Sequence, residues 1–455
     1  MTSTQAPAKS ADVRDARYEA AWAYLDSLQF FRIKLGLATM HQLLEGLGRP
    51  QERLRLIHIA GTNGKGSVAI TLATLLAEAG FRVGLYTSPH LVDVRERFVI
   101  NGLPISKEAF TSQIEALRRL FDQSGLHPTY FECTTLLALN WFAEERVDVA
   151  ILETGLGGRL DATNVVRPMV SVITDISRDH EQYLGTDIAS IVAEKAGIIK
   201  PGVPVVFSGR SAGSTEVIED FAKRLDSRLY LLGRDFRAKG SDGQLDYSGI
   251  YRNVAGQSLL NLPLSLPGAH QVVNAALALA ALETLAANFP VFSVSAEQIR
   301  SGLAKVRWPG RMEYLSVPFQ GSERHILLEG AHNEAGVEAL CAALADREAG
   351  REIVLVWGNM ADKHMEAARS TLFARVSRII LTQAEGERSA TPQTLWQSLN
   401  QEERAKARCI VSVEEALNAA MEPADSRTLI CVAGSLHLVG RARHFLVPEA
   451  GPCHE

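Results

Sequence analysis

The sequence predicts an α/β protein in two parts: a phosphate-loop (P-loop) domain with a mostly parallel sheet, and a smaller Rossmann-like α/β domain after it. Short β-branched runs alternate with helical patterns from Leu54 onward, which indicates βα units. A glycine-rich stretch separates the first predicted strand from its helix, and the alternation restarts after Gly310. At 455 residues the chain is long enough for two domains, each with its own core.

The first series of elements predicts the large sheet. Its strands are expected in the runs LRLIHIA, FRVGLYT, VDVAILET, MVSVITDI and GVPVVFSG. After the first run, Val68, Leu72, Leu75 and Leu76 recur at helical spacing, and Gly80 is a typical C-terminal stop. We expect residues 1–308 to form one domain, with the first fifteen or so residues as a loose tail.

The second series follows a predicted hinge at Pro309 and Gly310. Its strands are expected in HILLEG, EIVLVWG, RIILTQ, RCIVSV and LICVAG, each followed by a helical stretch. Because no GxGxxG follows its first strand, the sequence gives no reason to expect a dinucleotide site. Residues 309–455 are expected to form the second domain.

Composition excludes several function classes. A net charge of -5 argues against a general nucleic-acid binder, which usually carries a basic surface. The five cysteines form no CxxC pair, which is typical of reduced thiols in the cytoplasm. The N-terminus lacks an apolar signal core, and the most apolar run, AALALAALETLAANF, contains Glu283 and is too short to span a bilayer. We expect a soluble, cytoplasmic protein without a membrane or nucleic-acid partner.

The stretch IHIAGTNGKGS, residues 57–67, is a candidate phosphate-binding loop. A strand ending at Ala60 and a helix starting near Ser67 would direct backbone N–H groups at an anion, and Lys65 would add positive charge. The common pattern GxxxxGK[ST] is not met, because Ile59 replaces its first glycine and Gly66 separates the lysine from the serine. A generic glycine-rich turn is the alternative.

The loop GTNGKGS resembles that of the folylpolyglutamate synthase and dihydrofolate synthase family, relatives of the Mur ligases. The resemblance covers most of the chain, through YTSPHLVDVRERF, YFECTTLLAL, LETGLGGRLDATN, EKAGIIKPG, LPGAHQVVNAALAL, WPGRMEYL, GAHN and GSLHLVG. It implies a ligase that uses ATP and Mg²⁺, with K⁺ as an additional ion. We expect a monomer, because two domains could enclose the whole site. Such an enzyme joins L-glutamate to dihydropteroate or to a folate through an acyl phosphate.

The resemblance also implies roles for individual residues. The metal ligands would be Ser67, Ser88, Glu153 and His180. The nucleotide would be bound by Thr62, Asn63, Gly64, Lys65, Gly66, Ser67, Asn274, Arg311 and Glu329. Catalysis would involve Lys65, a carbamylated Lys195, His332 and Glu329. The pterin or folate would contact Phe131, Glu132, Cys133, Thr134, Leu160, Asp161 and Ala162, and the run RERF from Arg95 would position its acidic tail.

Simpler interpretations exist for several of these residues. Ser88 before Pro89 could begin a turn, and His180 alone could be a core histidine. Lys195 could be a solvated helix lysine, and Arg311 could form a surface salt bridge. The run CTTLLALNWF could be a buried helix, which is compatible with a substrate role. Glu153 ends an apolar strand, where a carboxylate without a partner is costly, and this favours a role in a site.

Three departures from the family pattern stand out. The chain reads EGAHNE, with Glu329 and Glu334, where the family usually has DGAHNP. His364 replaces the last aspartate of DKD, and ISRDH lacks the small residue common before Asp-His. Glutamate reaches about 1.5 Å further than aspartate, so either the surroundings compensate or the activity has changed. The alternatives are a Mur-type ligase for another carboxylate and a catalytically altered paralogue that binds folate or nucleotide.

Overall fold

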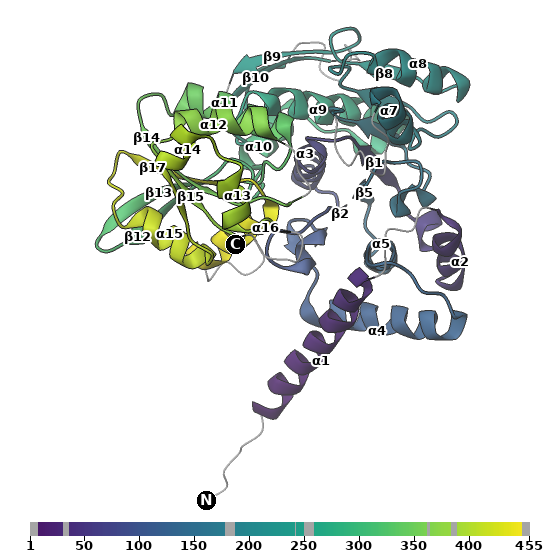
Figure 1. Cartoon of the computed structure of the whole chain (residues 1–455). Helices are drawn as coiled ribbons and strands as arrows, with labels where there is room; N and C mark the ends of the chain where they lie inside the picture. Colours follow the sequence, from purple (N-terminus) through teal and green to yellow (C-terminus); the bar gives the residue numbers. More distant parts are fainter. Residues whose placement is uncertain are drawn as a thin grey trace, which may run out of the picture.

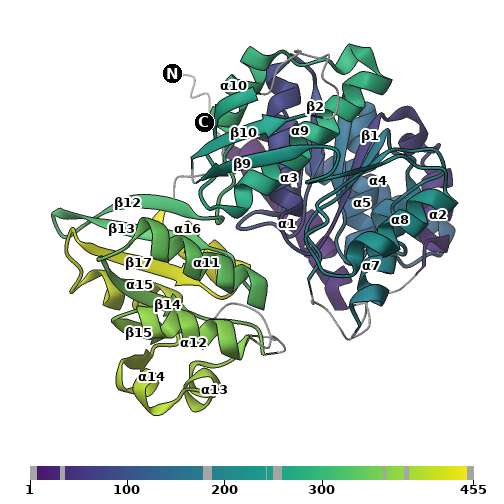
Figure 2. The ribbon, with the colours of Figure 1, turned by 90° about the horizontal axis from the view of Figure 1, so that it is seen from above.

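The computed structural model describes residues 8–30, 36–177, 187–241, 243–249, 259–361, 365–383 and 389–447 (Figure 1). The predictions made for His180 and His364 lie outside the described residues. Within the described part, two successive stretches of chain build two separate large sheets. Figure 2 shows the corresponding units side by side, the second one in green and yellow.

The first unit is organised around an eight-stranded sheet with the order β4-β3-β2-β5-β1-β6-β7-β8. Six neighbouring strands, from β2 to β8 in that order, run parallel, and β3 and β4 are antiparallel at one edge. The mostly parallel sheet expected from the sequence is therefore confirmed. The strands are β1 (Leu56–Ala60), β2 (Val83–Tyr86), β3 (Phe98–Ile100), β4 (Leu103–Pro104), β5 (Val149–Glu153), β6 (Val170–Ile173), β7 (Val205–Phe207) and β8 (Leu229–Leu231).

Helices cover both faces of this sheet, which explains why its central strands are apolar at every position. In β1, Ile57 and Ile59 pack in the same cluster as α3 and α9, whereas Leu56 packs on the other face in the cluster of α4 and α5. The helices of this unit are α1 (Ala8–Ser27), α2 (Ala38–Gly46), α3 (Lys65–Glu78), α4 (Lys107–Ser124), α5 (Tyr130–Glu144), α7 (Ile188–Ala196), α8 (Ser214–Arg224), α9 (His270–Asn288) and α10 (Ala296–Lys305). Short 3₁₀ helices are η1 (Leu28–Phe30), η2 (Pro50–Arg53), η3 (Val94–Arg97), η4 (Ala162–Val165) and η5 (Pro290–Phe292).

A small antiparallel sheet of β9 (Arg237–Ser241), β10 (Gln244–Ser248) and β11 (Leu259–Pro263) was not expected from the sequence. Its buried side chains Leu245, Tyr247 and Leu262 join the same core as α9. The Tyr247 hydroxyl donates a hydrogen bond of 2.8 Å to Glu283 of that helix. The carboxylate in the middle of the apolar run is thus held by a buried partner.

The helix α9 has the length and apolar composition of a membrane span, but 78% of its most apolar window is buried inside the protein. The apolar run AALALAALETLAANF, which we expected to be too short to cross a bilayer, overlaps the C-terminal part of this helix of 19 residues. Its packing against α3 and β6 marks it as a core helix. The N-terminal tail is also shorter than expected, because α1 already begins at Ala8.

The second unit contains a six-stranded sheet with the order β12-β13-β17-β14-β15-β16. All pairs are parallel except β12 with β13, so this is the second α/β sheet predicted from the sequence. Its strands are β12 (Glu313–Phe319), β13 (Ser322–Glu329), β14 (Glu352–Trp357), β15 (Arg378–Leu381), β16 (Ala407–Cys409) and β17 (Thr428–Ala433). Its helices are α11 (Glu334–Arg347), α12 (Glu366–Arg375), α13 (Pro392–Gln397), α14 (Gln401–Ala405), α15 (Val413–Met421) and α16 (Leu436–Leu446).

The two units meet where the loop after β2 reaches α16. Leu91 packs against the core cluster that includes Val439 of this helix. A side chain at Gly440 would place its Cβ only 1.9 Å from the Leu91 carbonyl oxygen, so the backbones approach closely there. Gly310, in the predicted hinge, lies beside the same leucine. The loop after β2 therefore belongs to the first sheet but is packed by the second unit.

Candidate functional site

A cavity of about 320 Å³ is lined by both units. Its walls come from the loops that follow β1, β2 and β5, from the first residues of α9 and α11, and from the hinge segment. Most residues predicted for the nucleotide, the metal and catalysis line it: Thr62, Asn63, Gly64, Lys65, Gly66, Ser67, Ser88, Glu153, Lys195, Asn274, Arg311, Glu329 and His332. Loops at the carboxyl ends of parallel strands are the usual place for a ligand in this kind of sheet.

The candidate phosphate loop connects β1 to α3. The strand ends at Ala60 as predicted, but the helix begins at Lys65, two residues earlier than expected. Gly64 precedes the helix with a φ of 87°, in the left-handed region, and no side chain caps the helix. The first N–H groups of α3 are therefore available to an anion. The Lys65 Nζ donates to the carbonyl oxygens of Gly61 and Thr62, each at 3.2 Å.

The extra glycine of the loop makes room for a tryptophan. A Cβ at Gly66 would lie 2.8 Å from the Trp308 ring, and one at Gly64 would lie 2.4 Å from the Asn274 Oδ1. Trp308 precedes the hinge and Asn274 belongs to α9, so both approach the phosphate loop from distant parts of the chain. Close approach of these side chains is the physical reason why the loop cannot carry side chains at these two positions.

Two of the predicted metal ligands are in direct contact. The backbone N–H of Ser88 donates to the Glu153 Oε2 at 3.2 Å, and the Glu153 side chain is only 4% exposed. Burial raises the pKa of Glu153, while the positive charges of Lys65, Arg311 and Arg97 act in the opposite direction. Within the described ranges, no three His, Cys, Asp or Glu side chains are grouped as for a metal ion. The available donors are oxygen atoms of Ser67, Ser88 and Glu153, the kind that suits Mg²⁺.

Lys195 is buried at the C-terminal end of α7. Its exposed fraction is 3%, and its Nζ donates to the Gly61 carbonyl oxygen at 2.9 Å. The solvated helix lysine considered as an alternative is therefore wrong, because the side chain points inward to the phosphate loop. The neighbouring carboxylate, Glu194, pairs with Arg159 on the surface, at 2.7 Å.

Glu329 connects the second sheet to the hinge. Its Oε2 accepts a hydrogen bond of 2.7 Å from the Met312 N–H, and its Oε1 lies 3.7 Å from the Arg311 guanidinium. Burial raises the pKa of Glu329, an effect opposed by the charge of Arg311 and by backbone hydrogen bonds. The additional methylene of glutamate is thus used to reach the hinge backbone. Arg311 is not in a surface salt bridge, since this partner is buried.

An amide pair joins the phosphate loop to the N-terminus of α11. The Asn333 Nδ2 donates to the Asn63 Oδ1 at 3.0 Å, and the Asn63 Nδ2 donates to the Asn333 Oδ1 at 3.4 Å. Asn333 also caps α11 through the Gly336 N–H. Beside it, the His332 Nδ1 donates to the Gly330 carbonyl oxygen at 2.8 Å. These contacts place the start of α11 next to the loop.

The residues predicted for the pterin or folate do not line this cavity. Cys133, Thr134 and Glu132 are buried on α5, where Glu132 closes a capping box with Thr129 and Thr134 bonds to the Tyr86 hydroxyl at 2.8 Å. The run CTTLLALNWF is therefore confirmed as a buried helix. Of the seven residues, only Phe131 and Leu160 keep an appreciable exposed surface.

Asp161 organises the loop GLGGRLDATN instead of facing the cavity. Its Oδ2 accepts the N–H groups of Gly155 and Leu156, each at 2.9 Å, and its Oδ1 accepts the Thr163 N–H and hydroxyl. The Thr163 hydroxyl also contacts the His58 Nε2 at 2.8 Å. Ala162 is buried beside this network. A buried chain of polar groups thus connects β1 to the loop after β5.

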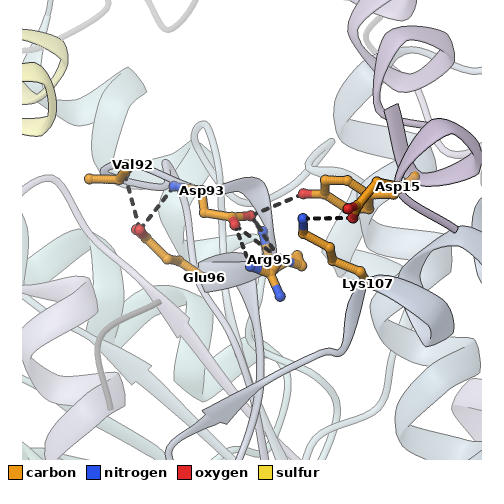
Figure 3. Close-up of polar contacts among 7 residues, drawn as sticks. Asp15, Val92, Asp93, Arg95, Glu96 and Lys107 are labelled. Atoms are coloured by element: carbon orange, nitrogen blue, oxygen red, sulfur yellow. Dashed lines mark hydrogen bonds and ion pairs between the residues drawn. The ribbon is translucent and has the colours of Figure 1, made fainter. Parts of the chain in front are cut away.

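The loop after β2 is held by its own acidic side chains (Figure 3). Glu96 accepts N–H groups of Leu91, Val92 and Asp93, at 2.7, 3.1 and 2.9 Å. Arg95 pairs with Asp93 at 2.7 Å, so its charge is already engaged within the loop. Arg97 is buried and donates to the His90 Nδ1 at 2.9 Å. The predicted use of the run RERF to position a substrate stays a prediction.

Several residues that line the cavity were not identified from the sequence: His90, Arg210, His270, Gln271, Trp308 and Asn333. Gln271 lies 3.4 Å from the Ser67 hydroxyl and accepts a hydrogen bond of 2.9 Å from Asn274. His90, His270, Gln271, Trp308 and Asn333 lie within the quoted motifs, and this was the available signal. For Arg210, no motif surrounds the residue.

Two family models match the chain in succession: the Mur ligase middle domain over residues 59–282, and the glutamate ligase domain of Mur ligases over residues 310–436. The dihydrofolate synthase/folylpolyglutamate synthase of Bacillus subtilis is 38% identical over 351 residues, 76% of this chain and 80% of the relative. Mycobacterium tuberculosis folylpolyglutamate synthase, solved with ADP and AMPPCP, gives a TM-score of 0.84 at 30% identity, covering 95% and 99% of the two chains. E. coli FolC in complex with DHPP and ADP gives 0.82 at 33% identity, covering 95% and 98%.

We predict that Gly66→Ala weakens the affinity for ATP by about tenfold or more, because its Cβ would push Trp308 or displace the loop by a fraction of an ångström. Isothermal titration calorimetry would measure the affinity. Combining Gly66→Ala with Trp308→Leu should restore part of it, and Trp308→Leu alone is the matched control. Unchanged ATP affinity in Gly66→Ala would contradict this account of the extra glycine.

A second prediction concerns His58, whose pKa burial lowers from 6.5 to about 3, with a smaller effect from Lys200. Below pH 6.5 the unfolded chain takes up a proton that the folded chain does not accept, so stability falls with acid. Between pH 7.5 and 5, the wild type should lose about 2 kcal/mol more than His58→Gln. Urea unfolding at several pH values measures this, with exposed His444→Gln as control. Parallel pH profiles of His58→Gln and wild type would disprove it.

Proposed function

We infer that this chain is an ATP-dependent ligase that joins L-glutamate to dihydropteroate or to folates, because it belongs to the folylpolyglutamate synthase and dihydrofolate synthase family of the Mur ligases. The observation that carries this function is the cavity between the units. It brings the phosphate loop, two buried carboxylates and the hinge arginine together. ATP would bind there, and its phosphates would meet the N-terminus of α3 and Lys65.

The reaction requires activation of a carboxylate. An oxygen of the substrate carboxylate attacks the γ-phosphorus of ATP, and ADP leaves. The amine of glutamate then attacks the resulting acyl phosphate, and phosphate leaves from the tetrahedral intermediate. We propose that Lys65 and Arg311 stabilise the negative charge during transfer. Asn274 and Glu329, on opposite sides of the loop, would hold the nucleotide.

We propose that Ser67, Ser88 and Glu153, with His180, hold Mg²⁺. Burial raises the pKa of Glu153, so a bound cation would stabilise its charged form. The oxygen donors of these residues suit magnesium. Bound there, the ion would neutralise charge on the phosphates. K⁺ as an additional ion, a monomeric state and a location in the cytoplasm complete the proposal.

Lys195 is proposed to be carbamylated. It is buried, and its Nζ lies at the back of the phosphate loop. Addition of CO₂ to the neutral amine would convert this cation into an anionic group close to Glu153 and the proposed metal. Mass analysis of the intact site, together with a crystal grown at high bicarbonate, would test this. An unmodified amine in both would exclude it.

The incoming amino acid is proposed to bind within the cavity, and the pterin beside it, next to the end where Phe131 approaches the lining residue Gly155. Glutamate would lie near His332, at the start of α11, where the helix N-terminus favours a carboxylate. Phe131 and Leu160 would contact the pterin directly, because they retain exposed surface. The buried Glu132, Cys133, Thr134, Asp161 and Ala162 would shape that end through the helix and loop they stabilise. The division into residues 1–308 and 309–455 fits this arrangement.

An assay with ATP, L-glutamate and dihydropteroate or tetrahydrofolate tests the function. We expect one ADP for each amide bond formed, and no ADP release without the pterin substrate. Lys65→Ala should lower kcat/KM by about 100-fold or more, since it removes a positive charge from the transition state. The exposed Lys223→Ala on α8 is the matched control. Absence of ADP and of a glutamylated product with both substrates would refute the proposed function.

The length of the Glu329 side chain, which allows its carboxylate to accept the Met312 N–H, gives a further prediction. Glu329→Asp should lower kcat/KM for ATP by about tenfold, because the Met312 N–H would lose its buried acceptor. Glu329→Gln keeps that acceptor but removes the charge opposite Arg311, so comparing the variants separates reach from charge. Unchanged or higher activity in Glu329→Asp would contradict this account. Tight pterin binding without turnover, and no turnover gained by Glu329→Asp, would instead favour the altered-paralogue alternative.

A further inference from the structure

Arg210 lies on a loop that is held rigidly at the edge of the cavity. The loop connects β7 to α8, and Gly209 turns it with a φ of 63°. The Ser208 hydroxyl donates to the Thr174 carbonyl oxygen at 3.1 Å, and the Ile176 N–H donates to the Ser211 hydroxyl at 3.3 Å. The backbone on both sides of Arg210 is therefore tied to the end of β6, the strand beside the phosphate loop.

The Arg210 side chain is exposed and lines the cavity. Among the residues that the structure describes, it has no hydrogen-bond or ion-pair partner. Four carboxylates of the described residues line the cavity, and no ion pair joins any of them to Arg210. Glu96 accepts backbone N–H groups, and Glu329 contacts Met312 and Arg311. Glu153 accepts the Ser88 N–H, and Asp175 accepts the Ser211 hydroxyl. The guanidinium thus does not neutralise a charge of the protein. A cation fixed in a cavity without a protein partner is suited to an anionic ligand.

Arg210 and Arg311 line the same cavity, and the residues near both of them indicate which kind of anion they would bind. Both charges act on His270, at the start of α9, and together with burial they lower its pKa to about 4. One arginine of the first unit and one of the second therefore line the same cavity near the start of α9. The same turn of α9 contacts the phosphate loop through Gln271 and Ser67. The two arginines therefore face the region where the phosphates of a nucleotide would lie.

We propose that Arg210 binds the phosphate chain of the adenine nucleotide, opposite Arg311. This rests on the proposed function, and it adds a residue that neither the motifs nor the resemblance assigned. A polyphosphate between the two guanidinium groups would be attracted to both, so nucleotide binding would also draw the two units together.

The test is the affinity of Arg210 variants for AMP, ADP and AMPPCP, measured by calorimetry on the full chain. Arg210→Ala should bind ADP about tenfold more weakly, since charge-assisted hydrogen bonds are worth that much or more. The loss should increase from AMP to ADP to AMPPCP, because the number of phosphate charges increases. Arg210→Lys should recover part of the affinity. Arg224→Ala, an exposed arginine on the neighbouring helix α8, is the control.

The outcomes separate this assignment from the function on which it rests. An ADP affinity of Arg210→Ala within about twofold of the wild type would overturn it. Equal losses for the three nucleotides would also overturn it, because the contact would then be to the base or ribose. If the wild type bound none of them, the proposed function would fail as well. With Arg311→Ala, a double variant that loses less than the sum of both single losses would support binding of one shared anion.

Discussion

The phosphate loop packs closely against three other parts of the chain, and the rest of the site depends on this packing. Thr174 of the neighbouring strand end, Asn274 of α9 and Trp308 before the hinge each lie where a side chain on the loop would have to be. The loop therefore consists of glycines at the contact points. Because the contacts come from distant segments, the loop also fixes α9 and the hinge relative to the first sheet. The nucleotide end of the cavity is in this way defined by backbone approach rather than by long side chains.

Buried carboxylates give the surrounding loops their shape. Asp161 collects the N–H groups of the loop after β5, Glu96 those of the loop after β2, and Glu329 that of the hinge. A carboxylate that accepts several backbone hydrogen bonds offsets part of the cost of its own burial and fixes otherwise irregular backbone. Glu153 has one such bond, from Ser88, and its remaining need for positive charge supports the proposed metal. Three of these carboxylates thus hold loop or hinge backbone, and the fourth, Glu153, has acceptor capacity left for a ligand.

Most of the fold could be predicted from the sequence because parallel strands buried on both faces read as continuous apolar runs, and each ends in a recognisable turn. All ten runs interpreted as strands are strands. The small sheet of β9, β10 and β11 was missed because β9 has the polar sequence RAKGS and is mostly exposed, and only the five residues of β10 alternate regularly between exposed and buried. The true start of α1 was missed because its sequence is polar and its contacts are with α4, far along the chain.

The sequence by itself determined the two α/β units, the phosphate loop and the candidate nucleotide and metal residues of the cavity, because these features depend on local spacing and on short motifs. Only the tertiary structure decided which charges remain available. Arg95 forms an ion pair with Asp93, and Lys195 points inward to the phosphate loop. Arg210 lines the cavity from a turn that carries no motif. It also decided that Glu329 holds the hinge. Such outcomes depend on distances between segments that lie far apart in the chain, and one-dimensional spacing contains no information on them.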